Sequence, residues 1–308
     1  MRGLLGFLGS RLLRALVALW LISTVVFVVM RLSGDQVPLL LPPDAPRSEI
    51  FRVRAELGLD RSLPVQYVVF LGHALTGDFG RSIHFREPAA RVVRGYLPAT
   101  LELGLTAFAL AVLVAVPIGL LSAMRRNTLL DHAAMGLALV GQAAPTFFIG
   151  ILLILLISLK AGLLPTSGRG SLAHLVLPAL TLGAFAMASI ARLTRSAVLE
   201  VLRADYIRTA RAKGLSEALV VAKHTLKNAA IPIVTITGLQ FGTLLGGAVV
   251  AETVFSWPGI GRLAVQSINN RDYPVVQCTV FLAALMFIVI NFFLDLLYGA
   301  LDPRIRAR

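Results

Sequence analysis

The sequence predicts an all-α protein that crosses a membrane six times. Of its 308 residues, 57% are hydrophobic and 15% are charged, whereas a soluble domain carries about 25% charged residues. A soluble chain of this length needs more polar surface to cover its core, so the composition indicates an integral membrane protein. Six apolar segments are long enough for the roughly 20 residues of a membrane-spanning helix. They are 12–30, 100–124, 133–159, 172–193, 229–254 and 275–301.

The first of these segments begins close to the N-terminus, after Arg11 and Arg14. A secretory signal has a shorter apolar core and a small-residue cleavage site. We therefore expect an uncleaved first span. Pro145 in the third span and Pro178 in the fourth predict bends that neighbouring helices tolerate. Small residues in the fifth span predict close helix approach. These are Gly238, Gly242, Gly246 and Gly247.

Lysines and arginines predict the orientation of the spans, because short loops rich in them stay in the cytoplasm. With the N-terminus inside, 16 fall in inner segments and 4 in short outer loops. The inner ones are Arg2, Arg11, Arg14, Arg125, Arg126, Arg192, Arg195, Arg203, Arg208, Arg211, Lys213, Lys223, Lys227, Arg304, Arg306 and Arg308, and the outer ones are Lys160, Arg169, Arg262 and Arg271. Both termini are therefore expected in the cytoplasm. The excess of basic residues in the inner segments also accounts for the net charge of +13, so a nucleic-acid partner is not needed to explain it.

Two outer segments carry further structure. The loop 31–98 is too long for a simple connector, and its stretch 57–71 has a turn signal followed by an apolar helical pattern, so we expect an extracytoplasmic cap. In 252–261, Phe255 and Trp257 suit the membrane interface, and a turn precedes a short amphipathic helix. Glu252 is interpreted as an interfacial carboxylate, with a position on a substrate path as the alternative.

The polar segment 193–229 is the largest expected cytoplasmic piece. Leu199, Leu202, Tyr206 and Ala210 recur at helical spacing. Gly214 is expected to end this helix with Lys213 in its last turn. Ser216 then caps a second helix with Glu217 at its start, which continues toward Asn228 before Pro232.

Three interpretations of this segment are possible. It is a basic loop with no further role, a helix-turn-helix for DNA, or a knob that docks a partner protein. Both of its ends are tied to spans, which disfavours the DNA-binding interpretation.

Short motifs along nearly the whole chain carry a family resemblance. In order they are R-L-S-G-D (31–35), L-G-L-D-R-S-L-P-V-Q-Y (57–67), G-D-F-G-R-S-I (77–83), L-P-A-T-L-E-L (97–103), L-P-T-S-G (164–168), A-E-T-V-F-S-W-P-G-I-G-R-L (251–263), R-D-Y-P-V-V-Q (271–277) and L-D-P-R (301–304). With D-Y-I-R-T-A-R-A-K-G-L-S-E (205–217), they resemble the dipeptide, oligopeptide and nickel branch of binding-protein-dependent ABC importer permeases. Ala210 and Gly214 match the family motif E-A-A-x-x-x-G, whose Glu and first Ala are replaced here by Arg208 and Thr209.

The resemblance implies a single type I importer permease domain over 1–308, which pairs with a second, often different, permease subunit. Two ATPase subunits dock the cytoplasmic loops, and an extracytoplasmic binding protein delivers the solute. The coupling residues implied are Tyr206, Thr209, Ala210, Ala212, Lys213, Gly214, Leu215, Ser216 and Glu217. The branch handles dipeptides, oligopeptides, nickel complexes and glutathione, and the sequence does not choose among them. The expected location is a bacterial inner membrane.

Candidate catalytic and metal-binding groups are sparse. The sequence has no G-x-x-x-x-G-K-[S/T] phosphate loop, and its five histidines form no H-E-x-x-H pair or Cys/His cluster, so no cofactor or metal is expected. The one cysteine, Cys278, lies in an apolar run and is expected to be buried. Asn291 and Asp295 are polar residues in the last span without a partner nucleophile at a recognisable spacing. The alternatives to an importer permease are an intramembrane enzyme and a secondary transporter.

Overall fold

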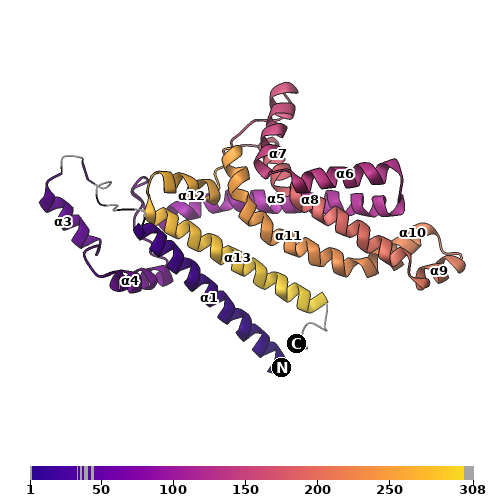
Figure 1. Cartoon of the computed structure of the whole chain (residues 1–308), viewed down its shortest axis with the longest axis horizontal. Coiled ribbons are helices and arrows are strands. Elements are labelled where there is room, and N and C mark those ends of the chain that lie inside the picture. Colours follow the sequence, from indigo (N-terminus) through magenta and orange to yellow (C-terminus); the bar gives the residue numbers. More distant parts are fainter. Residues whose placement is uncertain (1, 33, 35–36, 38–40, 43–44, 302–308) are drawn as a thin grey trace. The chain divides into compact units, whose positions relative to one another are not determined.

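The computed structural model describes residues 2–32, 34, 37, 41–42 and 45–301, and they form helices joined by turns (Figure 1). The only β contact within these residues is an isolated bridge between Arg81 and Pro88. The helices are α1 (Arg2–Leu32), α3 (Arg47–Glu56), α4 (Leu63–Thr76), α5 (Ala89–Met124), α6 (Leu129–Ala143), α7 (Thr146–Leu153), the π-helix η1 (Ile154–Lys160), α8 (Leu172–Leu202), α9 (Asp205–Ala212), α10 (Glu217–Leu219), the π-helix η2 (Val220–Thr225), α11 (Leu226–Val254), α12 (Ile260–Asn269) and α13 (Tyr273–Leu301). The predicted all-α class is confirmed.

Five helices are long and apolar enough to cross a membrane, and a bent pair makes six if it counts as one span. The pair is α6 with α7 and η1, and the helix axis bends by 114° between its two halves. The sequence predicted one bent span over 133–159. The structure instead has two helical segments separated by a break at Ala144 and Pro145. Ala144 precedes Pro145 and is extended, with φ −75° and ψ 134°, because a following proline disfavours the helical conformation.

The chain forms two compact units. The first comprises residues 1–99 and 259–289. Phe27 of α1 packs against Tyr67 and Phe70 of α4, with ring centroids 5.2 and 5.5 Å apart. The loop 31–98 therefore contains the folded helices α3 and α4, and its role as an extracytoplasmic cap stays a prediction.

The turn before α13 anchors the other part of this unit. The carboxylate of Asp272 accepts hydrogen bonds from the Ser82 hydroxyl and from the backbone N–H groups of Ile83 and His84, both at 3.2 Å. Asp272 is fully buried, and these donors offset the cost of burying its charge. The predicted amphipathic helix after Gly259 is α12, whose Leu263 is buried. Cys278 is buried, as expected, in the same apolar cluster as Leu263.

The second unit comprises residues 100–258 and 290–308 and is built around α8. This helix packs against α6, α7 and α11, and Figure 1 shows it running beside α6 and α11. Two glycines, Gly119 of α5 and Gly183 of α8, allow these two helices to approach each other closely. A Cβ on Gly119 would lie 2.5 Å from the carbonyl oxygen of Ala191, and one on Gly183 would lie 3.0 Å from that of Ala107. In the predicted small-residue stretch, Gly247 meets a neighbouring helix, since its Cβ would lie 3.3 Å from Leu182, whereas a Cβ on Gly246 would meet no atom within 4 Å.

Two expectations about the end of α11 are wrong. Glu252 does not reach the surface of the chain but is fully buried, and the hydroxyl of Thr100 donates a hydrogen bond to it at 2.6 Å. Phe255 and Trp257 are also fully buried. The reason is that the loop after η1 folds over this turn. Gly168 donates its N–H to the carbonyl oxygen of Phe255 at 2.9 Å.

Arg169, from the same loop, lies against the turn as well. Its guanidinium carbon is 5.8 Å from the centroid of the Trp257 ring, and its Nε and Nη2 donate to Glu102 at 2.9 and 2.5 Å. Residues 302–308, with the predicted basic C-terminus, and the side chain of Asp295 lie outside the described part of the structure.

Candidate coupling site

The polar segment between α8 and α11 folds into a compact knob, which we call the coupling knob (residues 203–225). The prediction that Leu199, Leu202, Tyr206 and Ala210 lie on one helix is wrong. The helix α8 ends at Leu202, and α9 begins at Asp205 after two linking residues. No glycine or proline marks the break, and the available signal was Asp205, an acidic residue that is favourable in the first turn of a helix.

The break changes which side chains of α9 face inward. Tyr206 is 45% exposed, whereas Ile207 is fully buried and Ala210 is 6% exposed. Ile207 and Ala210 form a small buried cluster with Val220 of η2. Val201 at the end of α8 and Leu215 after the turn pack against it. The knob therefore has its own apolar core, which also contacts the last turn of α8.

Gly214 ends α9 as predicted. Its φ is +77°, in the left-handed region that glycine adopts without steric cost. Its N–H donates to the carbonyl oxygen of Arg211 at 2.9 Å, and the N–H of Leu215 donates to that of Ala210 at 3.4 Å. This pair of hydrogen bonds is the Schellman motif, in which two otherwise unpaired helix carbonyls are satisfied.

The second limb of the knob differs from the prediction. Ser216 occupies the N-cap position of α10, but its side chain makes no capping hydrogen bond. Arg211 instead bridges the turn, with Nε and Nη2 at 3.0 and 2.5 Å from the Glu217 carboxylate. The helix then continues through η2 into α11 without a break, and Pro232 lies inside α11. The predicted end near Asn228 is wrong.

The nine predicted coupling residues separate by exposure. Leu215 is half-buried and Ala210 is buried. The exposed ones surround the turn, and we call them the exposed knob surface: Tyr206, Thr209, Ala212, Lys213, Gly214, Ser216 and Glu217. The residues that hold the knob together, Ile207 and Val220, were missed. Their signal was apolar character within a polar stretch.

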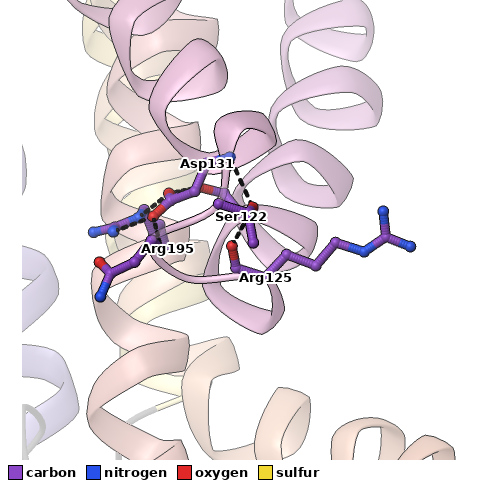
Figure 2. Close-up of polar contacts among 6 residues, drawn as sticks. Ser122, Arg125, Asp131 and Arg195 are labelled. Atoms are coloured by element: carbon purple, nitrogen blue, oxygen red, sulfur yellow. Dashed lines mark hydrogen bonds and ion pairs between the residues drawn. The ribbon is translucent and has the colours of Figure 1, made fainter.

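A polar cluster joins α8 to the turn between α5 and α6, and we call it the Asp131 clamp (Ser122, Asn127, Asp131 and Arg195; Figure 2). Asp131 is 1% exposed and lies in the first turn of α6. Arg195 of α8 donates to its carboxylate from Nε at 2.6 Å and from Nη2 at 2.7 Å. The Ser122 hydroxyl and the backbone N–H of Asn127, the latter at 3.0 Å, donate to the same carboxylate. In the sequence, Arg195 counted only as a cytoplasmic charge.

A cavity of about 840 Å³ lies in the first unit, between α1, α4, the 78–86 loop and the start of α13. Its charged lining residues are Arg31, Glu56, Arg61, Asp78, Arg81 and Arg86. Basic groups outnumber acidic ones, so the cavity is suited to an acidic group or to a zwitterion. Among the described residues, no three His, Cys, Asp or Glu side chains are placed to hold a metal.

Comparison with known proteins identifies the family. Residues 115–307 match the binding-protein-dependent transport system inner membrane component family, and residues 4–104 match the N-terminal family of the same membrane components. The chain is 46% identical over 304 residues to the glutathione transport system permease protein GsiC of Salmonella choleraesuis, which covers 98% of this chain and 99% of the relative. The GsiC protein of Escherichia coli is 45% identical over the same shares.

Solved structures of ABC transporters share the fold. An inward-facing structure of the MetNI methionine ABC transporter superposes with a TM-score of 0.58 at 20% identity, over 68% of this chain and 96% of that chain. An amino acid ABC transporter gives a TM-score of 0.55 at 20% identity, over 68% of this chain and 94% of that chain. The expected fold of an ABC importer transmembrane domain is confirmed. The chain belongs to the family of binding-protein-dependent transport system inner membrane components, and it is a transport permease rather than an enzyme.

Proposed function

We propose that the chain is a pore-forming permease subunit of an ATP-driven importer of small peptides, with glutathione and dipeptides as the first solutes to test. The observation that carries this proposal is the similarity to glutathione permeases over 98% of the chain. The family membership argues against the two alternatives, a secondary transporter and an intramembrane enzyme. The partners are a second permease subunit, two ATPase subunits and an extracytoplasmic binding protein.

The coupling knob is the docking site for an ATPase subunit in this proposal. Its exposed surface is polar and is held in shape from within by Ile207, Ala210 and Val220. A preformed surface binds a partner at a lower entropic cost than a loop that orders on binding. Movement of the ATPase subunits would then displace the knob as a unit and change access to the pore.

The cavity in the first unit suits delivery of a peptide, because a peptide carries a carboxylate and an ammonium group at its ends. On the proposed orientation this cavity faces the outside, where a binding protein would dock. Uptake of radiolabelled glutathione and of dialanine, measured in cells with and without the gene, tests the solute class. Uptake of neither would remove small peptides from the proposal.

Both termini and the coupling knob are expected in the cytoplasm, because 16 basic residues lie in the proposed inner segments against 4 in the short outer loops. Reporter fusions after Gly80 and Arg169 should report an outside location. Fusions after Ser216 and Arg308 should report an inside location. An outside signal after Ser216 contradicts the orientation and the docking role of the knob together.

The purified chain should hydrolyse no ATP by itself, because it has no phosphate loop. When it is produced together with its proposed partner permease and ATPase subunits, all of them should purify as one complex. ATP hydrolysis by that complex should rise when the binding protein and its solute are added. ATP hydrolysis by the rigorously isolated chain, or failure to retain any ATPase subunit, would refute the proposed function.

A further inference from the structure

A displacement of the coupling knob has to reach the spans, and it does so at two ends: η2 continues directly into α11, and the last turn of α8 packs against the core of the knob. Val201 packs on the buried cluster of the knob. Backbone hydrogen bonds continue across the link, from Arg203 to Glu200 at 3.2 Å and from Ala204 to Val201 at 3.0 Å. The N–H of Ile207 then donates to Ala204 at 3.0 Å. Because packing and hydrogen bonds are continuous here, the end of α8 moves with the knob.

The apolar contacts of this end of α8 do not set a direction of movement. Ala197 and Val198 of α8 pack with Ala123 of α5 and with Ala229 and Ile233 of α11. The fully buried members are mostly alanine, larger residues such as Leu120 of α5 pack around them, and apolar contact is non-directional. These contacts, with the close approach of α5 at Gly119, hold α8 against its neighbours, but they do not specify one orientation as a hydrogen-bonded ion pair does.

The Asp131 clamp is the directional contact at this level. Arg195 lies about two helical turns before the end of α8. Its planar guanidinium binds the Asp131 carboxylate through two parallel hydrogen bonds, a geometry that specifies orientation as well as distance. Figure 2 shows the carboxylate of Asp131 between Arg195 on one side and Ser122 on the other.

The same carboxylate determines the shape of the turn between α5 and α6. Asn127 has a φ of +62°, a left-handed conformation that asparagine tolerates, and its N–H donates to Asp131. Thr128 caps α6 by accepting from the N–H of Asp131 at 3.5 Å, and its hydroxyl donates to the carbonyl oxygen of Arg125 at 2.6 Å. The clamp therefore joins α5, α6 and α8 through one buried charge.

A buried ion pair is weak grounds for a purely stabilising role. The Asp131 side chain is buried and that of Arg195 is 24% exposed, so desolvation offsets part of their attraction, and well-packed apolar residues often serve stability equally well. What the pair provides in addition is a single relative orientation of the elements that it joins. An ion pair between the end of a moving helix and a neighbouring hairpin is therefore better explained by positioning than by stability.

We propose that Asp131 and Arg195 are positioning residues of the transport cycle. They make the end of α8 and the α5–α6 turn move together, so that displacement of the knob reaches α5 and α6 as well as α8. Without the clamp, the end of α8 loses the contact that fixes its orientation against the α5–α6 turn, and ATP is hydrolysed without the matching movement of the spans. This inference rests on the proposed function of the chain as an ATP-driven permease.

The test uses the whole transporter in proteoliposomes and the double variant Asp131→Asn/Arg195→Gln. Both charges are removed together, so that neither remains buried without its partner. ATP hydrolysis and import of glutathione are measured in the same vesicles. We expect normal insertion, retained ATPase subunits and near-normal ATP hydrolysis, with import per ATP lowered about tenfold, within the 5–150-fold range of typical coupling free energies. Arg192→Gln, an exposed arginine of the same helix, is the matched control and should match the wild type.

A solute-independent measurement accompanies it. Spin labels at the exposed positions Ala222 of η2 and Leu130 of α6, in a Cys278→Ser background, report the distance between the knob and α6. In the wild type, that distance should be the same in the nucleotide-free and vanadate-trapped states. In the double variant, the distance should differ between the two states, and its distribution should be broader.

Equal import per ATP and an equal distance in the double variant and the wild type overturn the inference. The inference is also overturned if the double variant is less abundant in the membrane but imports as much glutathione per ATP as the wild type, because the pair then has a purely structural role. A wild-type chain that assembles with no ATPase subunit instead overturns the proposed function.

Discussion

Gly214→Val is expected to give a permease that inserts normally but no longer transports or retains its ATPase subunit. Gly214 has a φ of +77°, which a β-branched residue resists at a cost of about 1–2 kcal/mol. The Schellman hydrogen bonds from Gly214 and Leu215 depend on this conformation. The buried core of the knob is small, so this cost is a large share of the free energy that keeps it ordered. The spans are remote from the change, so membrane abundance should be preserved.

The cost at this position is conformational and not steric within the chain. A Cβ on Gly214 meets no atom within 4 Å, so a side chain here points away from the protein, toward the proposed ATPase surface. Gly214→Asn is the matched control, because asparagine tolerates the left-handed region and should retain most of the transport. The exposed Arg203→Gln should be mild. Transport normalised to membrane abundance and recovery of the ATPase subunit are the measurements. A valine variant that transports at the wild-type rate with its ATPase bound contradicts the docking role of this turn.

Ala210→Glu should abolish transport by a different route, which is disordering of the knob. Ala210 is 6% exposed and packs with Ile207 and Val220. A carboxylate placed in this cluster has no partner, and burying an unpaired charge costs several kcal/mol, so the cluster should open instead. The ATPase subunit should be lost on purification, and the amide hydrogens of residues 205–225 should exchange faster with solvent.

Ala212→Glu separates folding from docking in the same helix. Ala212 is exposed, so the same substitution leaves the cluster and the hydrogen-exchange pattern unchanged. If the exposed knob surface binds the ATPase subunit, this variant should weaken docking while the knob stays folded. Equal hydrogen exchange in the Ala210→Glu variant and the wild type would refute the role of the buried cluster.

The sequence alone predicted the features that depend on local chemistry. Runs of apolar residues predicted the spans, because each span needs an uninterrupted length of hydrocarbon-compatible surface. Gly214 predicted the end of α9, since a left-handed residue after a helix favours glycine in almost any context. Pro145 marked the break between α6 and α7 for an equally local reason. The short motifs, in their order along the chain, also indicated the family.

Only the tertiary structure decided which polar and aromatic groups are buried and what they contact. Glu252, Phe255 and Trp257 have the residue types and the position of interfacial groups, yet segments from elsewhere in the chain bury them: Thr100 binds Glu252, and the loop after η1 lies against Phe255 and Trp257. In the sequence, Arg195 is one more basic residue of an expected inner segment, and only the fold of α8 brings it against Asp131, 64 residues away. Burial and ion pairing depend on which segments meet in space, and a linear pattern records only what lies along the chain. That physical limit is why the spans and the turn were predictable, whereas the Asp131 clamp and the inward face of the knob were not.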